Sequence, residues 1–260
     1  MAGLPQSLAG RVAVVTGGAS GAGAAICEEF ARRGATVVIA DWNEAGAQAL
    51  ATALRGEGCM AQAMAVDVTR SVDVGRLAEQ VRREHGGAGI LVNNAGVRTI
   101  KSFLEHSDED WERILSINLT GQFYCARALA PAMVERKWGR IINIASIASF
   151  VGRPDRVAYC AAKAGILGLT RGMAADLRHT GVTVNAIAPG SIATPLNHDA
   201  AHDSGVDWAA ETLAGRWGQG ADIAKAAAYL ASDDASYVNG TSLVVDGGWL
   251  SVKARDGEIA

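Results

Sequence analysis

A tyrosine and a lysine stand four positions apart in this sequence, at Tyr159 and Lys163. Residues at i and i+4 share one face of a helix, so this spacing predicts that the two side chains lie side by side. A free tyrosine has a pKa of about 10, which is too high for a proton acceptor near neutral pH. A neighbouring ammonium group favours the phenolate. The pair is therefore a candidate for general-base chemistry on a substrate hydroxyl group.

Two further polar residues are suited to assist such a base. Ser146 follows the apolar run Arg140–Ala145, and its hydroxyl group can donate a hydrogen bond to a substrate oxygen. Asn118 lies within a long helical pattern, where an amide can interrupt the backbone hydrogen bonds and hold a water that passes a proton outward. Each residue also has an ordinary alternative: Ser146 as a strand-end cap, Asn118 as helix surface, and Tyr159 with Lys163 as a helix face in solvent.

The stretch TGGASGAG, from Thr16 to Gly23, has the composition of an anion-binding turn. Its glycines, Gly17, Gly21 and Gly23, permit a tight turn and let a phosphate approach the backbone without a Cβ in the way. A helix that begins near Gly21 adds unpaired N–H groups and the positive end of its dipole. The next apolar run ends at Asp41, whose carboxylate can accept hydrogen bonds from both hydroxyl groups of an adenosine ribose.

The charge around this turn favours one form of a dinucleotide. The Asp41 carboxylate would repel a 2′-phosphate, and the turn contains Ser20 but no Arg or Lys that would bind one. We therefore expect the site to bind NAD rather than NADP. A glycine-rich turn without a ligand and an ordinary strand-end aspartate are the alternative interpretations of the two features taken singly.

The elements that must position these residues follow from an alternation of apolar runs and longer helical patterns. The predicted strands are continuously apolar, as strands covered on both faces are. They span Val12–Thr16, Thr36–Asp41, Ala61–Val66, Ile90–Asn93, Arg140–Ala145, Thr183–Ala188 and Ser242–Asp246. The predicted helices span Ala22–Arg33, Glu44–Gly56, Val72–Glu84, Asp108–Arg136, Ala158–His179 and Asp222–Ser232. The alternation predicts an α/β fold in which residues 1–260 form one domain, a Rossmann-type doubly wound parallel sheet of about seven strands.

Composition narrows the class of protein further. Hydrophobic residues make up 49% and charged residues 20% of the 260 residues, as in an ordinary globular protein. The net charge of −3, without a basic run, argues against nucleic acid as a partner. No apolar run has the length of a membrane helix, and the first residues lack a signal-peptide pattern, so we expect a cytoplasmic protein. Four scattered cysteines predict buried reduced thiols and no metal site: Cys27, Cys59, Cys125 and Cys160.

Taken in order along the chain, the motifs resemble those of the short-chain dehydrogenase/reductase family, in its single-domain branch. They are Thr16–Gly23 (T-G-x-x-x-G-x-G), Asp67-Val68, Asn93-Asn94-Ala95-Gly96, Asn118, Ser146, Tyr159-x-x-x-Lys163 and Pro189-Gly190. The resemblance covers nearly the whole chain and implies hydride transfer between an alcohol carbon and NAD. The cofactor-binding residues that it implies are Gly17, Ser20, Gly21, Gly23, Asp41, Asp67, Val68, Asn94, Ala95, Gly96, Tyr159, Lys163, Pro189, Gly190, Ile192 and Thr194.

The resemblance also implies individual roles within the cofactor site. Asp67 would bind the adenine amino group, and Val68 would flank it. The segment Asn93–Gly96 would close the fourth strand beneath the cofactor. Pro189-Gly190 and Thr194 would lie along the nicotinamide.

The catalytic residues that the resemblance implies are Ser146, Tyr159, Lys163 and Asn118. The Lys163 ammonium and an oxidised nicotinamide would together favour the Tyr159 phenolate. Lowering the tyrosine pKa by about 3 units corresponds to about 4 kcal/mol of differential stabilisation.

The substrate is not fixed by family, but three arginines suggest its charge. Arg98 follows the Asn93–Gly96 motif, and Arg153 and Arg156 lie between Ser146 and Tyr159 in the sequence. A guanidinium group suits a carboxylate, sulfonate or phosphate, so we expect a small polar substrate, anionic in form, such as a hydroxy acid or a carboxylated or sulfonated sugar or polyol. The alternative is that Arg153 and Arg156 pair with Asp155 or a neighbouring subunit and that Arg98 is solvated.

The polar stretch Ser191–Trp217 is long for a plain connection, which predicts a substrate lid. It contains His198, a further candidate for substrate binding, together with His202. Surface positions are the alternative for both histidines. Its tryptophans, Trp208 and Trp217, are expected to pack within the lid.

The resemblance also implies a homotetramer. The polar tail, residues 250–260, carries Lys253 and Arg255 and can approach a neighbouring subunit's pocket. A solvated tail is the alternative.

The leading hypothesis is an NAD-dependent dehydrogenase that oxidises a secondary alcohol of a small polar substrate. A 3-oxoacyl-carrier-protein reductase is the second hypothesis, although such an enzyme usually requires NADPH, which Asp41 and Ser20 disfavour. A non-catalytic NAD-binding scaffold is the third, and it would be expected to lose Tyr159, Lys163 or Ser146, all of which are present.

Overall fold

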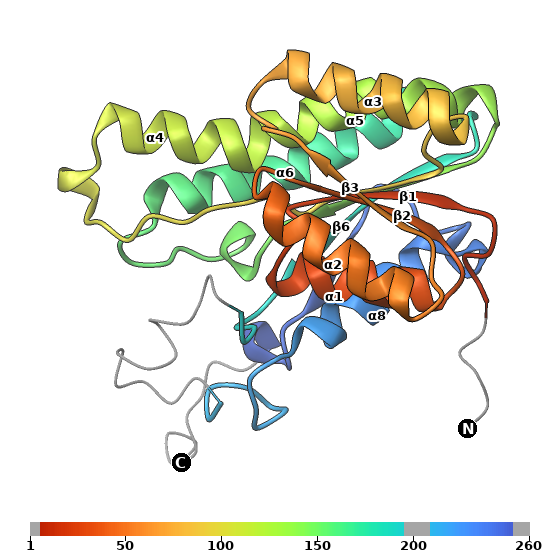
Figure 1. Ribbon diagram of the computed structural model, residues 1–260. Helices are drawn as coiled ribbons and strands as arrows, with labels where there is room; N and C mark the ends of the chain where they lie inside the picture. Colours follow the sequence, from red (N-terminus) through yellow and green to blue (C-terminus); the bar gives the residue numbers. More distant parts are fainter. Residues whose placement is uncertain (1–5, 195–208, 252–260) are drawn as a thin grey trace.

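The computed structural model describes residues 6–194 and 209–251. Seven strands form one sheet in the order β3-β2-β1-β4-β5-β6-β7, and every neighbouring pair is parallel (Figure 1). This arrangement confirms the predicted Rossmann-type fold. The strands are β1 (Val12–Thr16), β2 (Thr36–Asp41), β3 (Ala61–Ala65), β4 (Ile90–Asn93), β5 (Gly139–Ile144), β6 (Val182–Pro189) and β7 (Ser242–Val245).

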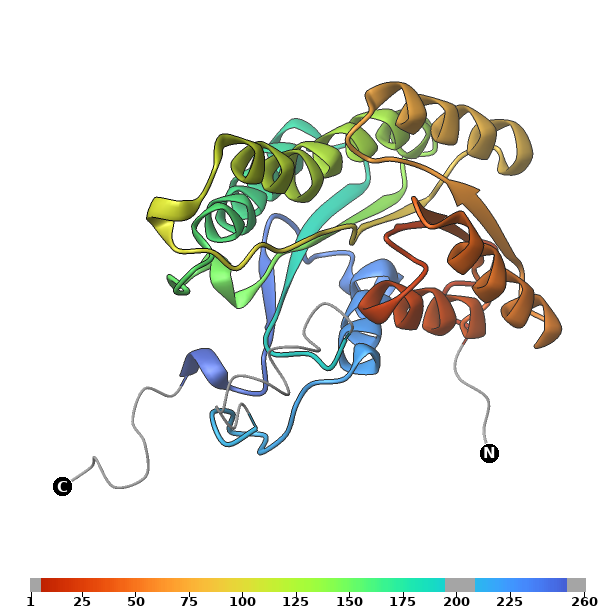
Figure 2. The same cartoon turned by 60° about the vertical axis from the view of Figure 1, so that its left-hand side comes forward.

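Helices cover both faces of the sheet, in two layers that are visible from both directions (Figures 1 and 2). Helices α1, α2 and α8 lie on one face, and α3, α4, α5 and α6 lie on the other. The helices are α1 (Gly21–Arg32), α2 (Glu44–Gly56), α3 (Ser71–His85), α4 (Asp108–Leu115), α5 (Gly121–Glu135), α6 (Val157–Asp176) and α8 (Gly220–Ala231).

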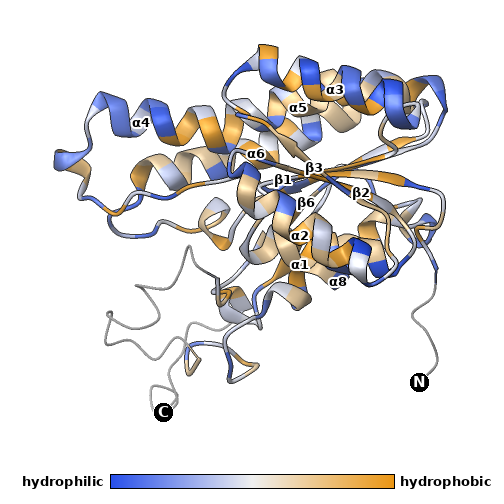
Figure 3. Cartoon of the chain, in the orientation of Figure 1, coloured by the Kyte–Doolittle hydropathy of each residue, from blue (hydrophilic) through white to orange (hydrophobic). Residues whose placement is uncertain are grey.

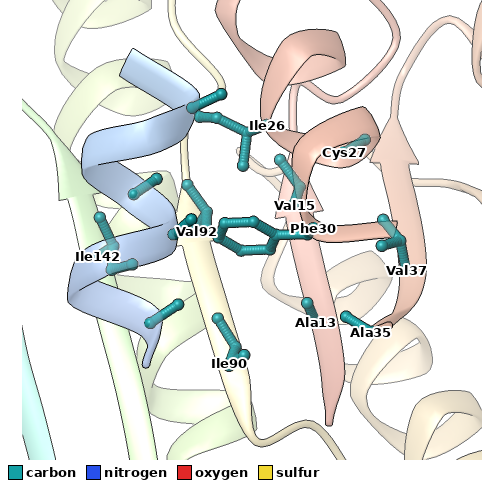
Figure 4. Packing of buried hydrophobic residues seen from close by; sticks show 14 of the residues in the cluster. Ala13, Val15, Ile26, Cys27, Phe30, Ala35, Val37, Ile90, Val92 and Ile142 are labelled. Atoms are coloured by element: carbon teal, nitrogen blue, oxygen red, sulfur yellow. The ribbon is translucent and has the colours of Figure 1, made fainter. Parts of the chain in front are cut away.

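The continuous apolar character of the strands is explained by this double cover. One apolar cluster fills the space between the sheet and the α1–α8 layer, and a second fills the opposite face. Apolar residues follow the central strands, whereas hydrophilic residues occupy the outer ends of α3 and α4 (Figure 3). The ring of Phe30 extends from α1 over β1 and β4 and is fully buried beside α8 (Figure 4).

The long helix predicted over Asp108–Arg136 is wrong in one respect. A π-helical segment, Ser116–Thr120, separates α4 from α5. Hydrophobic periodicity does not reveal such a segment, because the chain stays helical and only its hydrogen-bond pattern changes. The other predicted boundaries differ from the observed ones by a few residues at most, within the usual uncertainty of element ends.

The Phe30→Ala variant tests how far the fold depends on the cluster around α1. Deleting a fully buried phenylalanine ring lowers the free energy of unfolding by about 3–5 kcal/mol, because apolar contacts are lost and a cavity is left behind. Urea denaturation should show this loss in the free energy of unfolding. Phe103→Ala is the matched control, because Phe103 is 73% exposed and its removal should change stability little. Equal effects of the two variants would contradict the assigned packing.

Candidate active site

A single cavity of about 1100 Å³ brings together most of the residues predicted for the site. It lies at the carboxyl edge of the sheet, where β1 and β4 are neighbours and the strand order reverses. Ligands of open α/β sheets bind at this topological switch point. The predicted residues that line it are Gly17, Ser20, Gly21, Asp41, Asp67, Val68, Asn94, Ala95, Gly96, Arg98, Asn118, Ser146, Arg153, Arg156, Tyr159, Lys163, Pro189, Gly190, Ile192 and Thr194.

The predicted glycine turn joins β1 to α1 and forms one wall of the cavity. Gly17 has a φ of +62°, in the left-handed region that favours glycine. A Cβ on Gly23 would lie 2.0 Å from the Gly17 carbonyl oxygen, so only glycine fits there. Gly23 thus permits the close packing of the turn. It is not among the residues that line the cavity, and its contact with a cofactor stays a prediction.

Hydrogen bonds between Thr16 and Asn94 hold the ends of β1 and β4 together. The Thr16 hydroxyl group accepts from the backbone N–H groups of Asn94, at 3.0 Å, and Ala95, at 3.2 Å. The Asn94 side-chain amide donates to the carbonyl oxygens of Thr16, at 3.0 Å, and Gly17, at 2.9 Å. Asn94 therefore fixes the glycine turn. Sequence reasoning did not assign Thr16 a role of its own, because the pairing depends on two strands far apart in the chain.

Asp41 ends β2 and is only 6% exposed. One carboxylate oxygen accepts from the Ala19 N–H and the other from the Asn43 N–H, each at 2.9 Å. These bonds hold the carboxylate beside the glycine turn and leave lone pairs that can accept from ribose hydroxyl groups. The residues next to it in the cavity wall, Ser20, Trp42 and Asn43, are uncharged. Asp41 therefore offers hydrogen-bond acceptors to the hydroxyl groups of a ligand.

Trp42 is a cavity residue that sequence reasoning missed. Its side chain is 85% exposed, and the residue lines the cavity directly after Asp41. The signal available was an aromatic residue immediately after the strand-end aspartate.

Asp67 and Val68, for which the sequence predicts contacts with an adenine, also line the cavity. One Asp67 carboxylate oxygen accepts from both the backbone N–H and the hydroxyl group of Thr69. Val68 is buried against Gly121, where a Cβ would lie 2.9 Å from a Val68 methyl group. Both residues line the same cavity as Asp41, so the three can face one adenosine.

Asn118 occupies the π-helical segment that breaks the predicted long helix. Its side-chain amide donates to the carbonyl oxygens of Ile114, at 3.0 Å, and Val97, at 2.9 Å. In a regular helix the Ile114 carbonyl would accept from the backbone N–H four residues later, so the side chain replaces a backbone donor. The Asn118 Oδ1 atom is buried and accepts from no described group. This oxygen is therefore free to accept from a ligand or a water in the cavity.

Ser146, Tyr159 and Lys163 come together from two elements. Ser146 follows β5 and begins a short 3-10 turn, Ile147–Ser149, in which its Oγ accepts from the Ala148 N–H at 3.1 Å. Tyr159 and Lys163 lie on the first turns of α6, with the Lys163 Nζ 5.5 Å from the centroid of the tyrosine ring. The Lys163 Nζ donates to the Ile144 carbonyl oxygen at 2.8 Å. The predicted shared helix face is thus observed.

Burial dominates the electrostatics of this pair. Because protein atoms surround its hydroxyl group, burial raises the pKa of Tyr159, while hydrogen bonding with Ser146 and the charges of Arg98 and Arg156 lower it. Burial also lowers the pKa of Lys163 to about 7, so part of its ammonium charge is lost near neutral pH. The expected acidic tyrosine is therefore not produced by Lys163 within the protein alone.

All three predicted arginines line the cavity, and the charges of two of them, Arg98 and Arg156, lower the pKa of Tyr159. Arg156 is the N-cap residue of α6, three residues and less than one helical turn before Tyr159. Burial lowers the pKa of Arg153, and the charges of Arg156 and Arg98 lower it further, so the three guanidinium groups are close enough to interact. Among the described residues, Asp155 forms no ion pair with Arg153 or Arg156, so this part of the alternative interpretation is not observed.

Some predicted residues lie beyond what the structure describes. His198, His202 and Trp208 fall outside the described residues, as do most of the predicted lid and tail. Trp217, from the end of the predicted lid, does line the cavity.

Helix α4 contributes three further cavity residues that sequence reasoning missed, at positions with helical spacing: Glu109, Glu112 and Arg113. Periodicity alone does not indicate which residues of a surface helix border a cavity.

The sequence also led to expectations about the cysteines and about membrane-spanning helices. All four cysteines are free; Cys27 and Cys125 are buried as predicted, but Cys59 and Cys160 are partly exposed. Burial raises the pKa of Cys125 to about 12, which keeps it protonated. Among the described residues, no helix has the length and apolar character to cross a membrane, and no group of three potential metal ligands is found.

Comparisons with known proteins identify the family. A family model described as enoyl-(acyl carrier protein) reductase matches residues 17–250. The 3-oxoacyl-(acyl-carrier-protein) reductase FabG of Haemophilus influenzae is 39% identical over 239 residues, which cover 92% of this chain and 98% of that protein. A D-threitol dehydrogenase of Mycolicibacterium smegmatis is 41% identical over 243 residues, covering 93% and 94%. The chain therefore belongs to the short-chain dehydrogenase/reductase family, as its motifs predicted, and is an oxidoreductase that acts on CH–OH groups.

Solved structures agree with this assignment. The crystal structure of a gluconate 5-dehydrogenase from Burkholderia cenocepacia, in complex with NADP and tartrate, has a TM-score of 0.91 to this chain. The two sequences are 38% identical, and the match covers 95% of this chain and 98% of the other. Nicotinamide cofactors are thus bound by relatives with the same fold.

The Arg156→Gln variant should make Tyr159 harder to ionise. The Arg156 charge lowers the tyrosine pKa, so its removal should move the ionisation of Tyr159 to higher pH. Ultraviolet difference titration of tyrosinate measures this, with Tyr159→Phe as the blank. Arg156→Lys keeps the charge and should restore the original midpoint, and Arg127→Gln, on the exposed face of α5, is the control. A midpoint that moves to lower pH in Arg156→Gln would show that the assigned electrostatics are wrong.

Proposed function

We propose that this protein is an NAD-dependent dehydrogenase that oxidises a secondary alcohol of a small polar, anionic substrate, such as a hydroxy acid or sugar acid. The observation that carries the proposal is one cavity that holds Asp41 at one end and Ser146, Tyr159 and Lys163 at the other. The first group suits an adenosine ribose, and the second suits proton transfer at an alcohol.

The chain's own residues would hold the cofactor along this cavity. The first residues of α1 line the cavity at the glycine turn, where their backbone N–H groups would bind the pyrophosphate. Asp41 would accept from the ribose hydroxyl groups, and Asp67 would accept from the adenine amino group. Gly190, directly after β6, also lines the cavity, and its close contact with Asp246 leaves no room for a Cβ. When bound, NAD⁺ supplies the acceptor for the hydride and a positive charge.

The candidate catalytic residues would then act on the alcohol. Tyr159 takes the hydroxyl proton. Ser146, whose Oγ accepts from a backbone N–H and which hydrogen-bonds to Tyr159, would turn its hydroxyl hydrogen toward the substrate oxygen when the alcohol is bound. Lys163 is held by the Ile144 carbonyl oxygen beneath the tyrosine ring and can exchange protons near neutral pH. Asn118, through its unoccupied Oδ1 acceptor, would hold a water that passes the proton outward.

The arginines support an anionic substrate. Arg98, Arg153 and Arg156 line the cavity that also contains Tyr159, and a planar guanidinium group binds a carboxylate in bidentate geometry. Two relatives have names that include small polyhydroxy compounds, D-threitol and gluconate, and the second was crystallised with tartrate. Turnover of NAD⁺ over matched neutral and acidic polyols tests the proposal, and a preference for the acids is expected.

A 3-oxoacyl-carrier-protein reductase is the second candidate, favoured by the 39% identity to the enzyme of Haemophilus influenzae. The uncharged wall around Asp41 argues for NAD and against the NADPH that this activity usually requires. Faster turnover with NADPH and a 3-oxoacyl thioester than with NAD⁺ and any polyol would favour this alternative. The non-catalytic scaffold remains the least supported interpretation, since the candidate catalytic residues are all present and adjacent.

Tyr159→Phe tests the proposed base. Loss of the hydroxyl group removes the proton acceptor, so kcat should fall by about 10²- to 10⁴-fold, the range of general-base catalysis. The affinity for NADH, measured by fluorescence, should change by less than about twofold, because the ring remains. Tyr124→Phe, on α5 and outside the cavity wall, is the matched control. Equal losses of turnover and NADH affinity would assign Tyr159 to cofactor binding alone.

A double change, Asp41→Asn with Trp42→Arg, tests the cofactor preference. The asparagine removes the charge that repels a 2′-phosphate but keeps one acceptor for the backbone, and the arginine adds a phosphate-binding group. The ratio of kcat/KM for NADP⁺ to that for NAD⁺ should rise about 10- to 100-fold, as expected for loss of a charge-assisted hydrogen bond.

Asp67→Asn is the control for this change, since Asp67 lies in the same cavity at the adenine end and should affect both cofactors equally. An unchanged ratio in the double variant would mean that Asp41 does not contact the ribose.

A further inference from the structure

Trp249 contacts one of the cavity arginines without lining the cavity itself. The Arg153 Cζ lies 5.2 Å from the centroid of the Trp249 ring. Arg153 lines the cavity, and Trp249 does not. A guanidinium group at this distance from an indole is attracted to the ring face and loses little of its ability to form hydrogen bonds. The tryptophan therefore contacts the arginine on a side that is not part of the described cavity wall.

The position of Trp249 is fixed by the turn that follows β7. One carboxylate oxygen of Asp246 accepts from the Gly248 N–H and the other from the Leu250 N–H, each at 2.8 Å. The Trp249 N–H donates to the Asp246 carbonyl oxygen at 3.3 Å. Gly248 has a φ of +84°, which lets the chain reverse here. The ring is thus presented by a constrained short turn at the carboxyl edge of the sheet.

Arg153 carries its charge in an electrostatically unfavourable position. It is half-buried, and it carries its charge beside Arg98 and Arg156, which disfavour it. A long side chain under like-charge repulsion has many alternative rotamers, and fixing one of them costs conformational entropy. Contact with the Trp249 ring lowers that cost before any substrate arrives, which is preorganisation of a binding group.

We propose that Trp249 is a positioning residue that determines specificity, because it orients the Arg153 guanidinium group to receive the carboxylate of the substrate. This inference rests on the proposed function, and it joins two segments far apart in the sequence: the turn after β7 and the loop before α6. The effect of Trp249 should depend on the charge of the ligand. Loss of the ring should weaken the binding of an acidic ligand and leave a neutral ligand of the same shape unaffected.

Tartrate and threitol are a matched pair for this test, since they share a four-carbon chain with two inner hydroxyl groups and differ in having carboxylate or hydroxymethyl ends. Calorimetric titration of each into the NADH complex gives the dissociation constants. Trp249→Ala should weaken tartrate binding about 3- to 30-fold, the range of a ring–guanidinium contact, and should leave threitol binding unchanged. Trp249→Phe keeps an aromatic face and should restore most of the tartrate affinity.

Two arginine variants complete the design. Arg153→Ala should weaken tartrate binding at least as much as Trp249→Ala, and the double variant should add little to either, because the two residues act together. Arg127→Ala removes a guanidinium that contacts aromatic rings on α5, away from the cavity, and should have no effect. Unchanged NADH affinity in every variant shows that the fold and the cofactor site are intact.

The possible failures are distinguishable. If Trp249→Ala weakens tartrate and threitol alike, or if Arg153→Ala weakens tartrate binding and Trp249→Ala does not, the positioning role is wrong and the proposed function stands. If Arg153→Ala does not weaken tartrate binding, or if the wild-type complex binds threitol and not tartrate, the proposal of an anionic substrate is wrong. The proposed role of Trp249 is then wrong as well.

Discussion

The candidate active site depends on the hydrogen bonds that tie the end of β1 to the end of β4. Thr16 and Asn94 exchange these bonds at the point where the strand order reverses. The crevice opens there because the chain leaves β1 toward one helical layer and leaves β4 toward the other. If these ends separated, the glycine turn and the segment leading to Arg98 would no longer face one cavity.

Burial is the second constraint, and it acts on the residues proposed for catalysis. Tyr159 and Lys163 lie where the protein disfavours both of their charged forms. The arginines at the substrate end and the positive charge of an oxidised nicotinamide oppose this effect at the tyrosine. In this interpretation the base becomes competent when the cofactor is bound, and Asn118 supplies a buried acceptor through which a proton can leave.

Particular residues show how far sequence reasoning reached. Asp41, Asp67, Ser146 and Gly190 each follow or end a predicted strand. Because parallel strands end on the same side of a sheet, all four lie at its carboxyl edge and line one cavity. The break at Asn118 could not be located from periodicity, since a π-helical segment keeps nearly the same apolar pattern. The packing of Gly23 against the Gly17 carbonyl oxygen was not foreseen either, because it depends on distances that sequence spacing does not reveal.

The sequence by itself determined the alternating α/β class, the family, and the types of residue available for proton transfer and dinucleotide binding, because these follow from local periodicity and from motifs of fixed spacing. Only the tertiary structure decided which side chains share an environment. The sign of the Tyr159 pKa change, the convergence of Arg98 with Arg153 and Arg156, and the contact between Arg153 and Trp249 all depend on burial and on distances between segments that are remote in the chain. Local pattern carries no information about such distances, since they are set by how the sheet and its two helical layers pack.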